Sequence, residues 1–529
     1  MRALKQSWLD RGLWCSASVG WSLPTAAERW PDRVALVLGE QRLTFAQLLA
    51  RVEAVGAEFV DRGTRPGDRV VVQLPNCVEL VVVIMAAWHI GAVAVPVVPL
   101  YRQREMAHIL SVTAPVVVVA AAVRGDRRPA AELDEVMPGS PARYAVGDVS
   151  GWGALPTVPR SAPHRPAGAD ECCLLLFTSG TTSDPKGVRH NSRSLLCQAR
   201  SYRDEALLGA SSPVLIPAPV AHIGAAVACT LLPCLTGAQT VVLESWNADT
   251  AVTVCDRERV ALAIGAPVFL SEMLDRYAAP SCPAHRIAMF HTGAAPTGST
   301  VIRRAHDAGI TAWRAWGMTE APTMTSGHPD DPLHLREGTD GRIDTGCEVR
   351  AVGEDGVPLP SGTPGELQIR GPKLMMGYLD PAQDAFDTDG WFATGDIGTV
   401  DADGCVTIRG RIKDIINRGG EKFSAAEIET AIATHPAVEA VAVVGVPHER
   451  LGEQVAAFVT VRTGAEWPGD QALLAHLEAA HLARQKLPVV WQVLSDFPRT
   501  PTGKIQKREL LADWTAGRSV GGGAITSAL

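Results

Sequence analysis

The chain has 529 residues, of which 46% are hydrophobic and 20% charged, and its formal net charge at pH 7 is −8. This length exceeds what a single compact core usually holds, so we expect one large domain and at least one small one. The acidic balance provides no basic field that would attract a nucleic-acid backbone or an anionic bilayer, so nucleic acid is not expected as a partner.

The cysteines and the apolar stretches give no sign of secretion or of a membrane. The 11 cysteines form no CxxC pair or Cys/His cluster with metal-ligand spacing, so a reduced, cytoplasmic setting is expected. Residues 1–14 lack the uninterrupted apolar core of a signal peptide. The most apolar stretch, residues 78–98, carries Glu79 and His89. It is predicted to be a buried helix followed by a buried strand, with no membrane span.

Short apolar runs alternate with segments of helical spacing, which indicates an α/β fold with mixed sheets covered by helices. These runs lie at residues 69–74, 93–97, 116–119, 173–177, 240–243 and 261–263. Over about residues 338–410 the pattern changes to alternating strands punctuated by Gly and Pro. This change predicts a β-rich subdomain within an N-terminal domain that spans residues 1–410.

A second boundary is expected near Gly410. Residues 411–416 would form a hinge, and residues 417–529 a small α+β C-terminal domain, because strands alternate with helices through that region. Ser424 followed by Glu427 predicts a helix N-terminus with a capping box, in which each side chain bonds to the backbone of the other residue.

A loop rich in hydroxyl groups and glycine, TSGTTSDPKG, follows the apolar run of residues 173–177. Backbone N–H groups and hydroxyls on such a loop donate to a polyanion, and its lysine supplies positive charge. The GxxxxGK spacing of a Walker A loop is absent. The loop is predicted to bind phosphate, the alternative being an ordinary polar turn, and the candidate contacts are Thr178, Ser179, Gly180, Thr181, Thr182 and Lys186.

The same loop resembles the signature of the adenylate-forming superfamily, which comprises acyl-CoA synthetases, adenylation domains of peptide synthetases, and luciferases. Further stretches resemble the motifs of this family in the same order, namely HTGAAP (291–296), WGMTE (316–320), WFATGD (391–396), GRIKDIINRGGEKFSAAEIE (410–429) and PRTPTGK (498–504). The resemblance implies an enzyme that uses ATP and Mg²⁺ to convert a carboxylic acid into an acyl-adenylate. It then implies transfer of the acyl group to a thiol, expected to be that of coenzyme A, by means of a mobile C-terminal lid.

The resemblance also assigns the residues around the adenine. Small side chains would let the backbone approach the base, and the WGM segment would lie beside it. This chain has tryptophan at a position where the family usually has tyrosine, so a hydrogen bond from a phenol hydroxyl is lost while a flat ring is kept. The expected adenine contacts are Gly293, Ala294, Ala295, Trp316, Gly317 and Met318.

The ribose, phosphate and metal contacts follow from the same resemblance. Asp396 would accept hydrogen bonds from the ribose hydroxyls, and Arg411 would add a second contact to ribose or phosphate. Glu320 would bind Mg²⁺, a hard cation that prefers oxygen ligands, with Thr181 beside it. Thr319 would donate to the α-phosphate.

The C-terminal motifs imply a catalytic lysine and a hinge. Lys504 is expected to contact the carboxylate substrate and the α-phosphate as charge moves to pyrophosphate. Lys413 matches the hinge, about which the C-terminal domain would rotate between the two half-reactions. Gly420 matches a glycine that lines the tunnel for the pantetheine arm of coenzyme A.

Residues 217–234 resemble the region that carries one wall of the acyl pocket. This segment contains no acidic side chain that would hold the ammonium group of an amino acid, so an amino-acid substrate is disfavoured. His222 matches a gate beside the reacting carboxylate. Small side chains at residues 223–226 and 265–267 leave room for a bulky apolar acyl group, such as an aryl, alicyclic, terpenoid or medium-chain acid.

Three alternatives remain open. The acyl acceptor would be an acyl carrier protein or another nucleophile in place of coenzyme A, or the chain would act as a luciferase-like oxygenase. From a different class, it would be a catalytically silent protein that binds a nucleotide or an acyl group. Self-association into a homodimer is left open.

Overall fold

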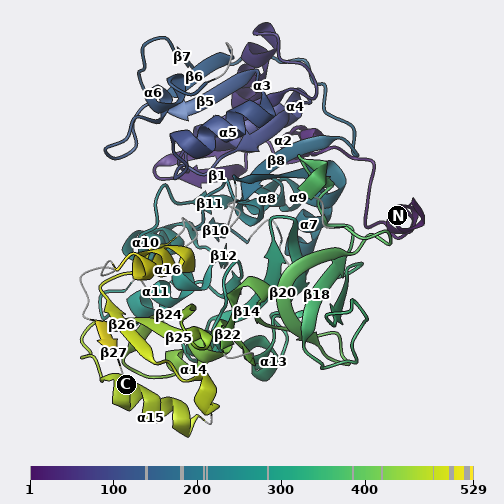
Figure 1. Cartoon of the computed structure of the whole chain (residues 1–529). Helices are drawn as coiled ribbons and strands as arrows, with labels where there is room; N and C mark the ends of the chain where they lie inside the picture. Colours follow the sequence, from purple (N-terminus) through teal and green to yellow (C-terminus); the bar gives the residue numbers. More distant parts are fainter. Residues whose placement is uncertain are drawn as a thin grey trace.

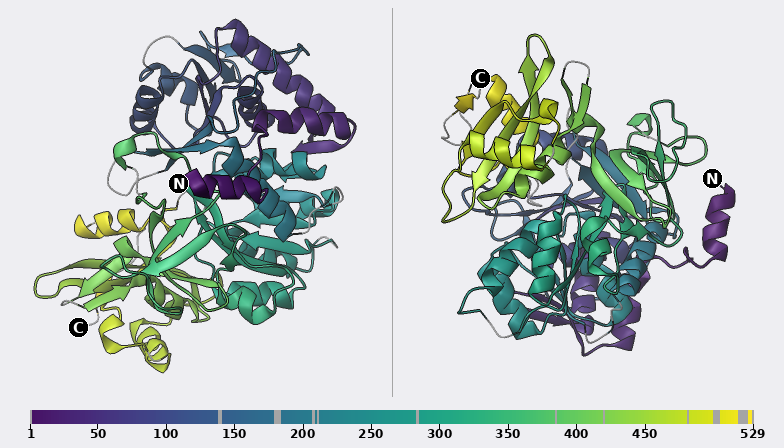
Figure 2. Two further views of the ribbon diagram at one scale, coloured as in Figure 1. Left: turned by 90° about the vertical axis from the view of Figure 1, so that its right-hand side faces the viewer. Right: turned by 90° about the horizontal axis from the view of Figure 1, so that it is seen from below.

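The computed structural model describes residues 2–137, 141–178, 184–206, 209, 212–282, 285–383, 386–418, 421–480, 482–499, 505–517 and 525–527. Two large sheets and a four-stranded sheet build the long N-terminal part, and a separate sheet with its own helices builds the C-terminal lobe (Figure 1). The N-terminal helix α1 (Arg2–Asp10) stands at the periphery, on the side away from that lobe (Figure 2).

The first large sheet is mostly parallel and has the strand order β19-β9-β8-β4-β3-β5-β6-β7. Its strands are β3 (Arg69–Gln73), β4 (Val93–Pro96), β5 (Val117–Ala121), β6 (Ala142–Val146), β7 (Gly153–Ala154), β8 (Cys172–Thr178), β9 (Lys186–Asn191) and β19 (Gly377–Tyr378). The helices between these strands are α3 (Phe45–Asp61), α4 (Val78–His89), α5 (Gln103–Thr113) and α6 (Pro129–Asp134). The antiparallel hairpin of β8 and β9 ends in the predicted phosphate loop.

The second large sheet has the order β16-β15-β14-β13-β12-β10-β11-β1-β2. Its strands are β1 (Val34–Leu38), β2 (Gln41–Thr44), β10 (Val214–Ile216), β11 (Thr240–Val242), β12 (Leu262–Gly265), β13 (Met289–Thr292), β14 (Thr311–Met318), β15 (Ala321–Ser326) and β16 (Arg342–Ile343). Its helices are η1 (Val19–Trp21), α2 (Ser22–Arg29), α7 (Ser192–Glu205), α8 (Ile223–Thr230), α9 (Leu232–Thr236), α10 (Ala248–Glu258), α11 (Pro267–Tyr277), α12 (Ser299–Asp307) and α13 (Leu333–Gly338).

Helix α4 joins the two large sheets. Apart from Glu79 its residues are buried, and it contacts β3 and β4 of the first sheet as well as α8, which packs on the second. A helix that is apolar on all sides belongs in a core. The buried helix and strand predicted for residues 78–98 are therefore confirmed as α4 and β4. No described helix is long and apolar enough to cross a membrane.

Four strands form a smaller antiparallel sheet, namely β17 (Glu348–Val352), β18 (Gly365–Arg370), β20 (Phe392–Val400) and β21 (Val406–Arg411). A short helix, η2 (Pro381–Gln383), precedes β20. Two strands from the region expected to be β-rich pair elsewhere, because β16 joins the second large sheet and β19 joins the first. The β-rich region is thereby tied to both large sheets.

The C-terminal lobe begins after the 3₁₀ turn η3 (Ile412–Asp414). Its remaining elements are β22 (Ile415–Arg418), β23 (Glu421–Ser424), α14 (Ala425–Ala433), β24 (Val438–His448), β25 (Gly452–Val461), α15 (Asp470–Ala479), η4 (Arg484–Lys486), β26 (Val490–Leu494), α16 (Lys507–Thr515) and β27 (Ile525–Ser527). Two apolar clusters, one including Ile428 and Trp491 and the other Phe458 and Leu510, give the lobe its own core.

The predicted capping box at Ser424 and Glu427 is wrong, although α14 does begin after Ser424. The hydroxyl of Ser424 is directed to the carbonyl oxygen of Arg409, to which it donates at 2.6 Å, and its oxygen accepts no capping bond from the helix backbone. Glu427 pairs with Lys486, with 2.6 Å between the carboxylate oxygen and Nζ. At both positions, a contact with a residue distant in sequence replaces the contact expected for a capping box. A capping box does form at the start of α3, between Thr44 and Gln47.

Gly341 provides a test of the packing between the β-rich region and β15. Its φ angle is +89°, and a Cβ there would lie 2.0 Å from the carbonyl carbon of Ser326. Gly341→Ala should lower the unfolding free energy by about 3 kcal/mol or more, because the new methyl group displaces backbone. Gly309 is the matched control, since its φ is +79° but nothing lies within 4 Å of such a Cβ. Gly309→Ala should cost only about 1–2 kcal/mol, and equal denaturation midpoints for the two variants would contradict this account of Gly341.

Candidate active site

The predicted site residues that the structure describes gather where the two large sheets and the four-stranded sheet meet. Residues Ser179 to Thr182 of the phosphate loop, together with Gly420 and Lys504, lie outside the described residues. Thr178 and Lys186 face each other at the end of the β8–β9 hairpin. Lys186 Nζ lies 5.1 Å from the ring centroid of Tyr378 in β19, so this lysine is directed toward the β-rich region.

Glu320 follows β14 and is held by contacts from Met375 and Tyr378 in the β-rich region. The hydroxyl of Tyr378 donates to Glu320 Oε1 at 2.6 Å, and the backbone N–H of Met375 donates to the Glu320 carbonyl at 2.8 Å. Tyr378 therefore touches both Lys186 and Glu320, which places the lysine and the carboxylate of two distant motifs around one ring.

The side chains around Glu320 determine whether a magnesium ion fits there. No group of three or more His, Cys, Asp or Glu side chains within the described ranges is placed to hold a metal. Mg²⁺ commonly takes one or two carboxylates and keeps water and phosphate oxygens as its other ligands. A single carboxylate beside a phosphate loop therefore fits Mg²⁺ that arrives with a nucleotide.

Thr319 is positioned through its backbone. His190, from β9, lies with Nε2 2.8 Å from the carbonyl oxygen of Thr319. Burial lowers the pKa of His190 to about 4, so its ring is neutral near pH 7. The contact ties the strand after the phosphate loop to the WGMTE segment, and sequence reasoning missed this histidine because a lone His carries no motif.

Asp396 is the most enclosed of the predicted nucleotide contacts, with 2% of its surface exposed. Trp316 Nε1 donates to its Oδ2 at 2.8 Å, and Arg411 Nε lies 2.7 Å from its Oδ1. Asp396 and Arg411 also face each other across the β20–β21 ladder. Trp316 thus donates a hydrogen bond to the carboxylate of Asp396, which sequence reasoning did not foresee. Adenine contact by Trp316, which is 7% exposed, stays a prediction.

The HTGAAP segment follows β13 in a tight arrangement. A Cβ at Gly293 would lie 3.1 Å from the carbonyl oxygen of Ala315, which precedes the WGM segment. Ala294 has a φ of +66°, a left-handed conformation that is uncommon for alanine. Strained backbone of this kind persists where the surroundings fix it, commonly at ligand sites.

The hinge segment lies beside the same carboxylates. Lys413 is in η3, and it lines a pocket together with Thr394, Gly395, Arg411 and Ile412. Burial and then the neighbouring Arg411 lower the pKa of Lys413, while Asp396 and Glu320 act in the opposite direction. Arg499, within the PRTPTGK motif, pairs as an antiparallel bridge with Ile505, the residue after Lys504.

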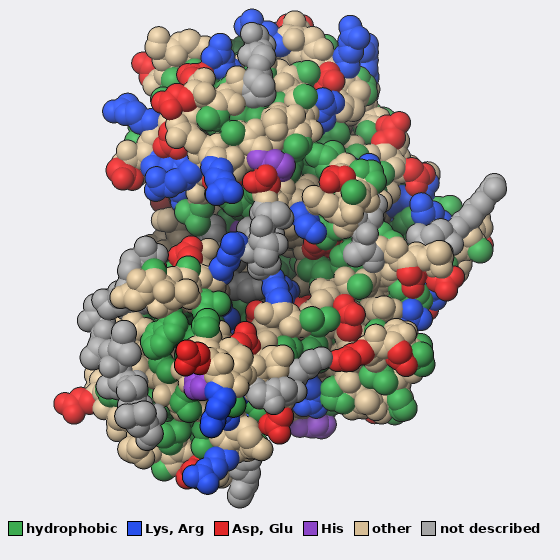
Figure 3. Space-filling model, in the orientation of Figure 1, with side chains coloured by type: hydrophobic (Ala, Val, Ile, Leu, Met, Phe, Trp, Pro, Cys, Tyr) green, Lys and Arg blue, Asp and Glu red, His purple; other side chains and the backbone are tan. Residues whose placement is uncertain are grey.

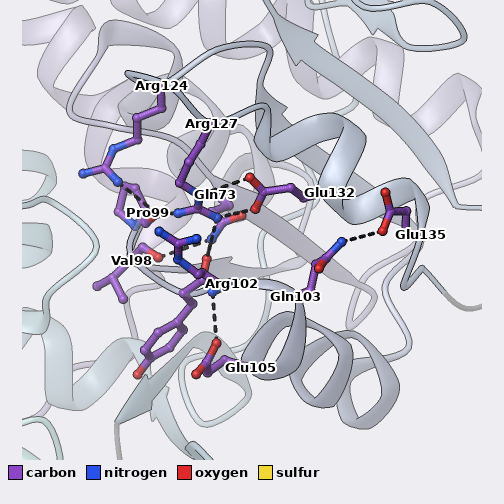
Figure 4. A network of polar contacts seen from close by, with 11 residues as sticks. Gln73, Val98, Pro99, Arg102, Gln103, Glu105, Arg124, Arg127, Glu132 and Glu135 are labelled. Atoms are coloured by element: carbon purple, nitrogen blue, oxygen red, sulfur yellow. Dashed lines mark hydrogen bonds and ion pairs between the residues drawn. The ribbon is translucent and has the colours of Figure 1, made fainter.

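A cluster of arginines lies beyond the carboxyl end of β5 in the first sheet (Figure 4). Arg124 Nη1 and Arg127 Nη1 both donate to the carbonyl oxygen of Pro99, at 3.1 and 2.9 Å. Arg127 also pairs with Glu132, whereas burial and then the adjacent Arg127 lower the pKa of Arg124. Sequence reasoning missed this cluster, although the run VRGDRR after an apolar strand is visible.

The arginine cluster is linked to the phosphate loop through α5. Arg102 immediately precedes α5, and His108 within this helix has Nε2 3.2 Å from the carbonyl oxygen of Pro185. Figure 3 shows Lys and Arg side chains around the hollow between the upper part of the molecule and the C-terminal lobe. Lys and Arg side chains therefore lie beside this hollow although the whole chain is acidic.

Comparisons with known proteins agree with this geometry. The model of the AMP-binding enzyme family matches residues 23–379, and that of the AMP-binding enzyme C-terminal domain matches residues 427–504. Triostin synthetase I of Streptomyces triostinicus is 35% identical, with 96% of this chain and 97% of that protein covered. Feruloyl-CoA synthase of an Amycolatopsis species is 32% identical over 91% of this chain and 96% of that protein.

Among solved structures, an anthranilate CoA ligase in complex with anthranoyl-AMP superposes with a TM-score of 0.85 at 22% identity, covering 95% of this chain and 98% of that one. This likeness supports the fold. The chain belongs to the adenylate-forming superfamily of AMP-binding enzymes, within the acyl-CoA synthetase family. It is an AMP-forming acid–thiol ligase, and the predicted α/β fold with a smaller C-terminal domain is confirmed.

The contact between Trp316 and Asp396 yields a test. Trp316→Phe removes the only neutral donor described on this carboxylate and leaves a buried oxygen without a hydrogen bond. The dissociation constant for AMP should rise on the order of tenfold, because a hydrogen bond to a charged group contributes about 1.5–3 kcal/mol. Calorimetry measures this constant. Trp391→Phe is the control, since Trp391 packs against Arg350 and Arg370 in the four-stranded sheet, and an equal change in both variants would refute the assigned role.

Proposed function

We propose that this enzyme is an ATP-dependent acyl-CoA synthetase for a bulky aryl, alicyclic, terpenoid or medium-chain carboxylic acid. It would form acyl-AMP with release of pyrophosphate and then pass the acyl group to coenzyme A. The supporting observation is that Lys186, Glu320 and Asp396 meet at one junction, with the hinge residue Lys413 beside the two carboxylates.

In the first half-reaction the substrate carboxylate attacks the α-phosphorus, and the bond to pyrophosphate breaks. Asp396 would accept hydrogen bonds from the ribose hydroxyls, Lys186 would bind the β- and γ-phosphates, and Thr319 would donate to the α-phosphate. Glu320 would hold Mg²⁺, which offsets phosphate charge when bound. Lys504 would contact the charge that develops between carboxylate and phosphate.

In the second half-reaction the thiol attacks the acyl carbon of the mixed anhydride and AMP leaves. Rotation about Lys413 would withdraw Lys504 and bring Gly420 toward the adenylate, so that one site serves both steps. The lobe has its own apolar core, which supports movement as a unit.

Small side chains favour a bulky acyl group. Residues 223–226 are Ile-Gly-Ala-Ala at the start of α8, and the segment 217–234 has no acidic residue. Relatives named as ligases for medium-chain fatty acids, ferulate and a hydroxynaphthoate are consistent with acids of this size. His222, which precedes α8, would lie beside the reacting carboxylate.

The arginine cluster favours coenzyme A as the acceptor. The nucleotide end of coenzyme A carries a 3′-phosphate and a diphosphate. The phosphopantetheine arm of a carrier protein has neither group. Among the described residues, the hydrogen-bond acceptor for the Arg124 guanidinium is a backbone carbonyl, which carries no net charge. The positive charge of Arg124 is therefore available to a phosphate. Transfer to a carrier protein is the second candidate, because one relative is named both salicylyl-CoA synthase and salicylate adenylyltransferase.

Two assays test the proposed function. Acid-dependent exchange between ATP and pyrophosphate reports the first half-reaction, and CoA-dependent release of AMP reports the second. A panel of aryl, alicyclic, terpenoid and fatty acids should contain at least one acid that supports both. Exchange without CoA-dependent turnover, combined with loading of a holo-carrier protein, would favour the second candidate, and no exchange with any acid would favour a silent binding protein.

Lys504→Ala separates the two half-reactions. Adenylate formation should fall by about 10²–10³, because a charge-assisted contact to the transition state is lost. Thiol transfer from supplied acyl-adenylate should fall much less. Arg508→Ala is the control, since Arg508 is an exposed cation a few positions further on. Equal loss of both half-reactions in Lys504→Ala would contradict the assigned role.

Arg124→Gln tests the acceptor. The KM for CoA should rise on the order of tenfold, while the KM for pantetheine, which lacks the nucleotide phosphates, should not change. Arg143→Gln is the matched control, because Arg143 lies in β6 of the same sheet and pairs with Asp134. Unchanged CoA kinetics in Arg124→Gln would remove this support for coenzyme A.

A further inference from the structure

Helix α7 turns a polar face toward the protein interior. Gln198, Tyr202 and Glu205 are spaced i, i+4 and i+7, so they share one side of the helix. Gln198 is 0% exposed and Tyr202 is 5% exposed. A buried helix face of this kind is normally apolar or fully hydrogen-bonded, so each polar atom on it requires a partner.

Four polar side-chain atoms on and beside this face lack a hydrogen-bond partner among the residues that the structure describes, and two of them are the buried carboxylate oxygens of Glu205. Gln198 Nε2 donates to Thr323 Oγ1 at 3.0 Å, but Gln198 Oε1 is buried and unpaired. His291, in β13, is 5% exposed, and its Nε2 is also buried and unpaired. The rings of His291 and Tyr202 pack edge to face with centroids 5.5 Å apart, so His291 and the polar face of α7 belong to one cluster.

Helix α8 packs against the same side of α7, and a further unpaired atom lies just before this helix. A Cβ at Gly224 would lie 3.2 Å from the hydroxyl oxygen of Tyr202, so the start of α8 faces the polar side of α7. His222 immediately precedes α8, and its Nε2 is buried without a hydrogen-bond partner in the described part of the chain. His291 comes two residues before Gly293, at which the proposed adenine segment begins, so the cluster lies next to the nucleotide site.

Unpaired buried atoms are costly. Each one forfeits about 1–3 kcal/mol relative to water, and several in one region of a native core are unusual unless a ligand or ordered water supplies the missing partners. An alkyl chain or an unsubstituted ring cannot do so, because it has neither donors nor acceptors.

We propose that Gln198, His222 and His291 bind neutral hydrogen-bonding substituents, such as a hydroxyl, carbonyl or ring nitrogen, on an aromatic acyl group. The inference rests on the proposed function and refines its substrate class. An aromatic acyl group is favoured because the cluster contains flat rings. One pair of them is His291 and Trp313, which stack with ring centroids 5.6 Å apart. Gly224 lets the start of α8 approach Tyr202 closely, since a Cβ there would lie 3.2 Å from the Tyr202 hydroxyl oxygen.

The charges around the cluster favour a neutral substituent over a second carboxylate. Burial lowers the pKa of both His222 and His291 to about 4, so both rings are neutral near pH 7 and each offers one donor and one acceptor. The nearby cation, Lys373, is fully buried and pairs with Asp344, and Glu205 lies close enough to stabilise its charge. No cation of this cluster is therefore left uncompensated for an anionic group.

The wild-type enzyme tests this inference directly. ATP–pyrophosphate exchange is measured with matched acids of equal shape, namely 2-naphthoic acid against hydroxy-2-naphthoic acids and against quinoline carboxylic acids. At least one polar member should exceed 2-naphthoic acid in kcat/KM by tenfold or more, because a site built for hydrogen bonds rejects an analogue that lacks them. Exchange that proceeds equally well or better with 2-naphthoic and fatty acids would overturn the inference while leaving the proposed function intact. Absence of exchange with every acid would instead overturn the proposed function on which it rests.

Two variants assign the preference to residues. Gln198→Met and His291→Phe should lower kcat/KM for the preferred polar acid by tenfold or more and leave 2-naphthoic acid and the KM for ATP unchanged. Arg203→Met, on the same helix but paired with the neighbouring Asp204, is the control and should change neither acid. An equal loss for both acids would indicate a structural role and overturn the assignment. If a variant fails to fold, as judged by circular dichroism, the wild-type panel still decides.

Discussion

The arrangement of the site depends on one buried carboxylate. Asp396 is almost fully enclosed, and a charge in that environment is stable only when hydrogen-bonded and paired. Its donor Trp316 comes from β14 of the second large sheet, and its ion-pair partner Arg411 is the last residue of β21, just before the hinge. Satisfying this single side chain therefore fixes the four-stranded sheet against the large sheet, directly before the predicted hinge at residues 411–416.

The same constraint links the fold to movement of the C-terminal lobe. Lys413 lies two positions after Arg411, and its ammonium group is partly desolvated beside a second cation. The contacts that such a movement would break include the hydrogen bond from Ser424 to Arg409. A neutral hydrogen bond of this kind contributes about 1 kcal/mol, so the lobe can exchange it for new contacts at small cost. The apolar cores of the lobe stay intact during a rigid rotation.

Much of the fold and the location of the site could be predicted from local sequence. Alternating apolar runs indicated the mixed sheets, and the hydroxyl-rich loop with Lys186 indicated phosphate, because both depend on neighbouring residues. The capping box at Ser424 failed because the Ser424 hydroxyl is turned toward the carbonyl oxygen of Arg409, in another strand, and the Glu427 carboxylate pairs with Lys486. The hydrogen bond from Trp316 to Asp396, the polar face of α7 and the cluster at Arg124 depend on side chains far apart in sequence. Such pairs have no local pattern, so a single sequence does not reveal them.

The distribution of charge explains how one site can handle three different substrates. Lysine and arginine side chains lie where phosphate is expected, at Lys186 beside the loop and at Arg124 beyond the carboxyl end of β5. The interior beyond His222 has neutral imidazoles and an amide, because burial keeps the histidines uncharged and Lys373 is already paired. An anionic substrate part bound in that interior would bring uncompensated charge into a desolvated region, whereas the same anion at the entrance finds a cation. Under the proposed function, separation of charged and neutral hydrogen-bonding groups would therefore orient an acid with its carboxylate toward the nucleotide and its ring toward α7, which is the orientation that adenylation requires.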